Sequence, residues 1–372
     1  MQNAAQENWR TLLSLFPGHW RERAAESGAI ERLRGFSSEE ALLRTLLLHI
    51  ANGLSLRETA VQAKLAHLAS VSDVALLKRL RNSEGWLRSL CVDLLGESGV
   101  PLAASSSKRR LRIVDGTIVK EPGKTGSQWR ILYSLQLPGL GCDFFDISAT
   151  EGEGTGESFR RVPLRQQDLV LGDAAYWSTA AIEFVQSRRA DVLVRVNPQT
   201  FVAYGARGHR LGLLARLRSI REPGQIGDWK VVLRGDKASV DGRVCAVRKS
   251  ENAIQHAQRR LHRRASKKQH IMKPETLEYA KYVIVFTTLA VESAEQVLEC
   301  YRLRWQIELV FKRMKTLTQL GHLPKHDDRS ARAWLYGKLL VALLTQKLIR
   351  IGRDISPWGY PSPLAPPDQP LA

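Results

Sequence analysis

The sequence predicts a mixed α/β protein preceded by an all-α N-terminal domain. The first hundred residues carry almost only helix signals, the pattern becomes extended from Leu111, and strands then alternate with helices. A very basic stretch interrupts this alternation before the last strand. We therefore expect five segments: a helical, DNA-binding one (1–104), the first part of an α/β core (105–197), a basic, mostly β insertion (198–281), the second part of the core (282–353) and a Pro-rich tail (354–372).

Capping signals delimit the N-terminal helices. The pair Asn52-Gly53 ends one helix, Ser55 and Glu58 form a capping box at the start of the next, and Ser72 begins a third. Short helices with a basic last member are compatible with a helix-turn-helix DNA-binding domain. A small bundle with a purely structural role is the alternative.

Extended segments follow from Leu111. They are rich in β-branched and aromatic residues, and glycines or charged loops bound them. Strands are predicted at 111–119, 129–137, 142–148, 168–173, 191–196 and 282–287, with shorter β segments at 229–233 and 242–247 and a helix at 179–189. Hairpins come first and crossovers later, which predicts a mixed sheet.

Charge is the most unusual feature of the composition. The 372 residues carry a formal net charge of +19, which favours a polyanionic partner, most simply nucleic acid. The four cysteines are scattered without metal-site spacing, so they are expected to be reduced packing residues. The N-terminus lacks a signal peptide, and the apolar run 331–344 is too short and too charged to span a bilayer. We expect a cytoplasmic protein with no membrane partner.

Two aspartates follow apolar runs. Asp115 comes after Leu111–Val114, and Asp173 ends the run that begins at Asp168. A carboxylate is costly there unless it is paired or binds a metal, and ligands collect at strand ends. With Glu308 from a late helix, three acids could converge on two divalent cations, as phosphodiester cleavage requires. The reserve ligands are Asp143, Asp146, Glu151, Glu153 and Glu157.

The segment 301–315 is predicted to be one amphipathic helix. At 100° per residue, Tyr301, Arg304, Glu308 and Lys315 fall within about 60° of one another. Such a stripe suits phosphate chemistry, because the glutamate can hold a metal while the cations and the phenol contact the DNA backbone. An ordinary solvated face with an i,i+4 ion pair is the alternative.

A second group of cations lies in the insertion. It comprises Arg259, Arg260, Arg263, Arg264, Lys267 and Lys268, with no acid among them. In a chain of this net charge, contacts with DNA phosphates are favoured over a merely solvated helix face. By contrast, Gly123-Lys124-Thr125 is not a nucleotide-binding loop, because Ile118 stands where a glycine is required.

These motifs together resemble a known family. Asp115 in a first strand, Asp173 followed by Tyr176, and the Tyr301–Arg304–Glu308–Lys315 signature are similar to the bacterial insertion-sequence DDE transposases of the Tyr-Arg-Glu-Lys signature group, the insertion-sequence-four family. The resemblance runs from about residue 42 to residue 344.

The resemblance implies a fold and an activity. The fold is an RNase H-like core with a mostly β insertion. Asp115, Asp173 and Glu308 would hold two Mg²⁺, for which Mn²⁺ can substitute, to nick transposon ends and transfer them into target DNA. Release through a hairpin is implied, with Tyr301, Arg304 and Lys315 on phosphates near the cleaved end. An aromatic residue, for which Trp229 is one candidate, would stack on a displaced base.

We therefore expect a DNA transposase working on the bacterial nucleoid. Its partners are double-stranded DNA, as terminal inverted repeats and as target, and a second copy of itself in the synapse. The N-terminal helices and the basic insertion would bind the repeats. The alternatives are a nuclease or resolvase on the same core that does not transfer strands, and an inactive DNA-binding regulator derived from a transposase. The presence of all three acids argues against the regulator.

Overall fold

The computed structural model describes residues 2–97, 109–121, 128–137, 141–267, 269, 271–318, 320, 323–325 and 327–355. The chain divides into two compact units, and each is discontinuous in sequence. Unit 1 comprises residues 1–99, 119–128 and 313–372, and unit 2 comprises residues 100–118 and 129–312. Gly123, Lys124, Thr125, Lys268 and the prolines of the tail lie outside the described residues.

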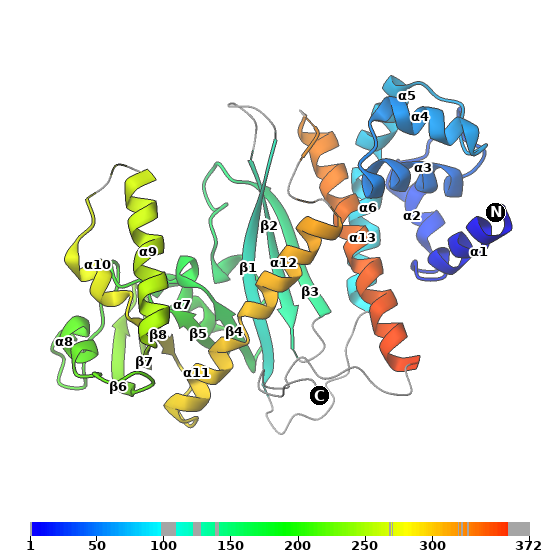
Figure 1. Cartoon of the computed structure of the whole chain (residues 1–372). Coiled ribbons are helices and arrows are strands. Elements are labelled where there is room, and N and C mark those ends of the chain that lie inside the picture. Colours follow the sequence, from blue (N-terminus) through cyan, green and yellow to red (C-terminus); the bar gives the residue numbers. More distant parts are fainter. Residues whose placement is uncertain are drawn as a thin grey trace. The chain divides into compact units, whose positions relative to one another are not determined.

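Unit 2 is built on one eight-stranded mixed sheet (Figure 1). The strand order is β3-β2-β1-β4-β5-β8-β7-β6. The β1–β4 and β4–β5 pairs are parallel, whereas the β2–β3, β5–β8, β7–β8 and β6–β7 pairs are antiparallel. The strands are β1 (Arg110–Lys120), β2 (Gln128–Gln136), β3 (Gly141–Ala149), β4 (Asp168–Gly172), β5 (Asp191–Arg195), β6 (Ile226–Arg234), β7 (Ser239–Arg248) and β8 (Tyr282–Thr287). The prediction of a mixed α/β core is confirmed.

The core of unit 2 lies against the central strands. Strand β4 is buried along its whole length, as expected for a central parallel strand covered on both faces. Val170, Val192 and Phe286 from three neighbouring strands belong to one apolar cluster, which also contains Ile182 of helix α7 (Thr179–Ser187). These strands therefore form a rigid base for the residues at their ends.

A buried ion network fixes the register between β1 and β4. The fully buried carboxylate of Asp168 accepts hydrogen bonds from Arg110 at 2.6 and 2.8 Å and from Arg112 at 3.2 Å. Arg112 is itself buried and also pairs with Asp143 of β3 at 2.7 Å. Removing one partner would leave a buried charge unpaired, so the network strongly favours this one alignment of the strands.

The insertion continues the core sheet instead of forming a sheet of its own. Strands β6 and β7 pair as a hairpin, and β7 pairs with β8 from Arg243–Thr287 to Arg248–Tyr282. The expectation of a mostly β segment also has to be adjusted, because three helices accompany the hairpin. They are α8 (Leu213–Arg218), α9 (Glu251–Lys267) and α10 (Pro274–Tyr279). The basic run predicted at 259–268 is part of helix α9.

Unit 1 is helical apart from short strand ends (Figure 1). The N-terminal helices are α1 (Gln2–Leu13), α2 (Trp20–Glu26), α3 (Glu39–Asn52), α4 (Leu56–Leu65), α5 (Asp73–Asn82) and α6 (Glu84–Glu97). Gly53 ends α3 in the left-handed conformation, with φ of 67°, and Ser55 and Glu58 form the predicted capping box of α4. Ser72 caps α5.

The last helix, α13 (Asp328–Ile355), belongs to the same unit as the N-terminal helices. It contacts α3, α5 and α6, and Arg332 pairs with Glu84 at 2.8 Å. The apolar run noted at 331–344 forms the inner face of this helix: Trp334, Leu335 and Leu340 are buried. Within the described parts of the chain, no helix has both the length and the apolarity to cross a membrane. Cys91, Cys142 and Cys245 are buried thiols, and Cys300 is partly buried.

The prediction of one continuous helix over 301–315 is wrong. Helix α11 (Ala294–Arg302) ends one residue after Tyr301. Helix α12 (Trp305–Leu317) begins after two intervening residues. Between them the backbone forms a tight turn. The backbone amide of Arg304 donates to the carbonyl of Tyr301, and the amide of Gln306 donates to that of Leu303, each at 3.0 Å and with three-residue spacing. No glycine or proline marks this turn in the sequence. Tyr301 and Glu308 therefore belong to different helices.

Candidate active site

Asp115 and Asp173 lie at equivalent positions on two neighbouring parallel strands. Strands β1 and β4 pair in register from Arg110–Asp168 to Ile113–Leu171, and the two aspartates come two residues further along each chain. Residues two apart point to the same face of a strand, so the register brings both carboxylates together. Asp173 lies just past the end of β4 and accepts the amide of Ala175 at 2.8 Å.

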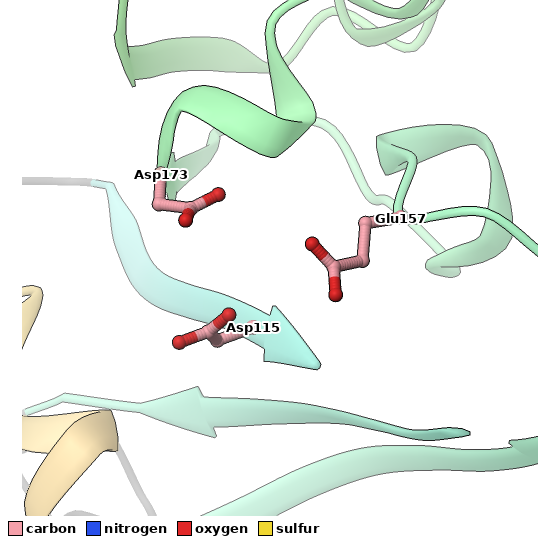
Figure 2. Close-up of side chains that lie close together, drawn as sticks. All are labelled: Asp115, Glu157 and Asp173. Carbon is pink, nitrogen blue, oxygen red and sulfur yellow. The ribbon is translucent and has the colours of Figure 1, made fainter. Parts of the chain in front are cut away.

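A third carboxylate completes the group. One oxygen from each of Asp115, Glu157 and Asp173 lies within 4.8 Å of the other two, and Figure 2 shows the three side chains facing a common space. Glu157 comes from the loop between β3 and the short 3₁₀ helix η1 (Phe159–Arg161). The sequence had offered it only as one of five reserve ligands.

Tertiary contacts single out Glu157 from the other reserve acids. Asp143 pairs with Arg112 at 2.7 Å and Asp146 with Arg161 at 2.5 Å, so both carboxylates are neutralised elsewhere. Glu151 and Glu153 lie exposed at the tip of the loop. Only Glu157 of the five joins the two aspartates.

Asp115, Glu157 and Asp173, here called the acid group, bring three ionisable carboxyl groups close together. Burial, helped by the negative charges of Asp173 and Glu157, raises the pKa of Asp115 to about 7, although the amide of Gly116 and the guanidinium of Arg304 oppose this shift. Burial and the charge of Asp173 also raise the pKa of Glu157. The group is therefore poised to bind a cation, which would stabilise the ionised forms.

The spacing and chemistry of the group fit a divalent metal ion. A hexacoordinate Mg²⁺ holds hard oxygen ligands at about 2.0–2.1 Å, so its ligands lie about 3 to 4 Å from one another. Oxygens that already lie within 4.8 Å need only small side-chain adjustments to reach this geometry. Carboxylates are also the donors that Mg²⁺ and Mn²⁺ prefer over nitrogen and sulfur.

Glu308 is linked to this group through an arginine. Arg304 donates to Glu308 at 2.5 Å and lies 3.9 Å from Asp115. The guanidinium of Arg304 is also 5.9 Å from the ring centre of Tyr301. The Glu308 side chain is 56% exposed, and it does not belong to the described acid group. The tight turn between α11 and α12 thus brings Tyr301, Arg304 and Glu308 together despite the broken helix.

The remaining predicted site residues are cations and one aromatic. Lys315 is exposed on the last turn of α12. Arg259, Arg260, Arg263, Arg264 and Lys267 are all exposed on α9, where they span about 140° of the helix circumference. None of these five has an ion pair within the described part of the chain. Trp229 of β6 is partly buried against the unit 2 core.

The mixed sheet carries clustered acids at its central strands, and the chain has an excess of cations. These two features together indicate a metal-dependent enzyme acting on nucleic acid. Residues 106–344 match the family described as "Transposase DDE domain". The chain belongs to this family of DNA-transposing enzymes, whose DDE domain implies the use of a divalent metal.

Curated relatives agree with this assignment. The chain is 33% identical over 365 residues to the putative transposase InsL for insertion sequence element IS186A of Escherichia coli K12, with 95% of this chain and 97% of the relative covered. It is also 33% identical over 366 residues to the transposase for insertion sequence element IS421 of Escherichia coli, with the same coverage. The transposase for IS231B of Bacillus thuringiensis subsp. berliner is 23% identical over 372 residues, which cover 89% of this chain and 77% of that protein.

Proposed function

We propose that this chain is the transposase of a bacterial insertion sequence of the Tyr-Arg-Glu-Lys signature group, the insertion-sequence-four family. It would cut the ends of its element and join them to target DNA. The observation that carries the proposal is the placement of Asp115 and Asp173 in the same register on adjacent parallel strands. The strand order β3-β2-β1-β4-β5 supports an RNase H-like arrangement of the core.

In this proposal Asp115, Asp173 and Glu308 hold two Mg²⁺, for which Mn²⁺ can substitute. When bound, two such ions activate an attacking oxygen and neutralise the charge on the leaving one. Glu308 must first exchange its contact with Arg304 for the acid group. Arg304 is then free to bind a phosphate with its planar guanidinium.

Tyr301, Arg304 and Lys315 would position the DNA. Tyr301 and Arg304 lie at the turn beside Glu308, and Lys315 lies two turns further along α12. We assign all three to phosphates near the cleaved end. Release of that end through a hairpin, with an aromatic side chain such as Trp229 on a displaced base, belongs to the same proposal.

Recognition of the terminal inverted repeats is assigned to the N-terminal helices and to α9. Helices α4 and α5 have ten residues each, and only residues 53–55 separate α3 from α4, which suits a helix-turn-helix reader. The exposed cations of α9 suit sequence-independent phosphate contacts. Because both ends of an element must be cut in one assembly, we propose a homodimer in the synapse, acting on nucleoid DNA in the cytoplasm.

A cleavage and joining assay tests the proposal. The DNA that flanks the gene supplies candidate inverted repeats, and the purified chain is incubated with these ends, a target plasmid and Mg²⁺. Joined products support transposition, whereas nicked products alone would identify a nuclease or resolvase. Asp115→Ala is expected to abolish cleavage and to leave DNA binding intact. A wild-type chain that binds the ends but neither cuts nor joins them would identify a regulator.

A further inference from the structure

We propose that Glu157 completes a divalent-cation site with Asp115 and Asp173 that forms in the DNA-free protein, before Glu308 takes part. The inference rests on the proposed metal-dependent chemistry and adds a residue that lies outside both the aspartate pair and the Tyr-Arg-Glu-Lys signature. It also gives the two glutamates different roles. Glu157 belongs to a preformed site, and Glu308 joins when DNA arrives.

The three acids already lie close enough together to share a cation. Glu157 already supplies the third oxygen of the described group, as Figure 2 shows. Its side chain is 19% exposed, against 56% for Glu308. A half-buried carboxylate beside two other acids is costly to keep without a positive partner, and its only described ion pair is a long one, 3.6 Å to Arg130.

Hydrogen bonds to the backbone hold the loop that carries Glu157 in place. Arg130 of β2 and Arg161 of η1 both donate to the carbonyl of Thr155, and Arg161 also donates to that of Gly156 at 3.1 Å. Two arginines thus anchor the backbone immediately before Glu157. Such anchoring lowers the conformational entropy that cation binding would otherwise cost.

Residue 116 is a glycine, so no side chain occupies the space beside the Glu157 carboxylate. A Cβ atom built on Gly116 would lie 2.8 Å from Oε1 of Glu157 and 3.2 Å from its Cδ. Real Cβ atoms essentially never come that close to another heavy atom. The glycine after Asp115 therefore leaves the space that the Glu157 carboxylate fills.

The buried hydroxyl of Tyr176 feels the charges of all three acids and has no hydrogen-bond partner among the described residues. The side chain of Tyr176 is 1% exposed, and its hydroxyl has no hydrogen-bond partner among the described residues. After burial, the charges of Asp115, Glu157 and Asp173 are what raises its pKa most, so the hydroxyl lies within their field. A buried donor without a partner is rare, and an oxygen bound among the three carboxylates would accept its hydrogen bond.

Binding of Mn²⁺ to the full-length, DNA-free protein tests the inference. Free Mn²⁺ is measured by electron paramagnetic resonance for wild type, Glu157→Gln, Glu308→Gln and Glu153→Gln. Glu153 is the matched control, because it is an exposed glutamate of the same loop. We expect Glu157→Gln to weaken binding about tenfold or more, and the other two variants to stay within about twofold of wild type.

Several outcomes would overturn the inference. One is wild-type affinity in Glu157→Gln, and another is a larger loss in Glu308→Gln than in Glu157→Gln. If Glu157→Gln does not fold, as judged by circular dichroism, Glu157→Asp replaces it. This variant keeps the charge on a side chain one methylene shorter, and unchanged affinity would again contradict the proposal.

One comparison separates this inference from the proposed function. If Asp115→Asn abolishes Mn²⁺ binding and Glu157→Gln does not, only the role of Glu157 is wrong. If Asp115→Asn also binds Mn²⁺ like wild type, the cation lies elsewhere and the catalytic assignment fails with it.

Discussion

Arg304 donates a hydrogen bond from Nη2 to Oε1 of Glu308 at 2.5 Å, across one turn of the chain. Its other terminal nitrogen, Nη1, lies 3.9 Å from a carboxylate oxygen of Asp115. One guanidinium therefore neutralises the signature glutamate and an aspartate of the acid group at the same time. A metal ion bound by these carboxylates would therefore compete with this arginine.

Removing Arg304 should release that competition. Arg304→Ala is expected to tighten Mn²⁺ binding to the DNA-free protein by roughly tenfold, because a positive charge within about 4 Å opposes a second cation. Cleavage of DNA ends should nevertheless fall, since the phosphate contact is lost. Calorimetric Mn²⁺ titration and the cleavage assay measure the two effects. Arg302→Ala is the control, because Arg302 is exposed and pairs with Glu299 at the surface, its only ion pair among the described residues. Weaker Mn²⁺ binding in Arg304→Ala would contradict the competition.

A methyl group at residue 116 should displace the Glu157 carboxylate. Gly116→Ala is expected to weaken Mn²⁺ binding about tenfold, since the new Cβ would overlap the present carboxylate position. Gly156→Ala is the matched control, because a Cβ there meets no atom within 4 Å. Equal affinities for the two variants would show that the close approach to β1 has no role in cation binding.

The raised pKa of Asp115 predicts that the stability of the metal-free protein depends on pH. This carboxyl has a pKa of about 7 when folded and an ordinary value of 3.8, so the folded, metal-free protein holds a proton that the unfolded chain has lost. Stability should therefore fall as the pH rises from about 4 to about 7. Asp115→Asn removes this effect and should stabilise the metal-free protein by on the order of 3 kcal/mol at pH 8, and by less than half of that at pH 5.

Thermal unfolding of both proteins in the presence of a chelator checks the prediction. The unfolding temperature of Asp115→Asn should exceed that of wild type by several degrees at pH 8. The difference should shrink as the pH is lowered. A difference that does not change with pH would mean that the Asp115 carboxyl is not the group that titrates.

The cations of α9 predict a salt dependence. Arg259, Arg263 and Lys267 are exposed at i, i+4 and i+8 of the helix. Changing all three to glutamine should reduce the slope of log K against log salt for duplex binding by up to about 2.7, since each phosphate contact contributes about 0.9. Fluorescence anisotropy over a range of roughly 50 to 300 mM KCl measures the slope. The double variant Arg259→Lys, Arg263→Lys keeps the positive charge of α9 and should keep the slope of log K against log salt. Unchanged slopes in both variants would leave α9 without a role in DNA binding.

The sheet and two of its acids could be predicted because their signals are local. Asp115 and Asp173 each follow an apolar run, and parallel strands in register bring such positions together. The joining of the insertion hairpin to β8 was not predictable, because it depends on pairing between segments far apart in the sequence. The turn at Leu303 and Arg304 has no glycine or proline to indicate it.

The choice among the loop glutamates could not be predicted either. Glu151, Glu153 and Glu157 lie within one Gly-rich stretch and look equivalent in sequence. What distinguishes Glu157 is tertiary: two arginines hold the preceding carbonyls, and Gly116 leaves room for the Glu157 carboxylate. A local pattern contains none of these contacts.

The pairing of β5 with β8 has a consequence for synthesis on the ribosome. Leu193 pairs with Thr287, so one edge of β5 waits for about 90 more residues to be translated. At roughly 5–20 residues per second this takes roughly 5 to 20 seconds. During that time an apolar strand edge is open to another emerging chain, which is a route to aggregation. The yield of folded protein should therefore depend on how fast ribosomes pass through residues 198–281.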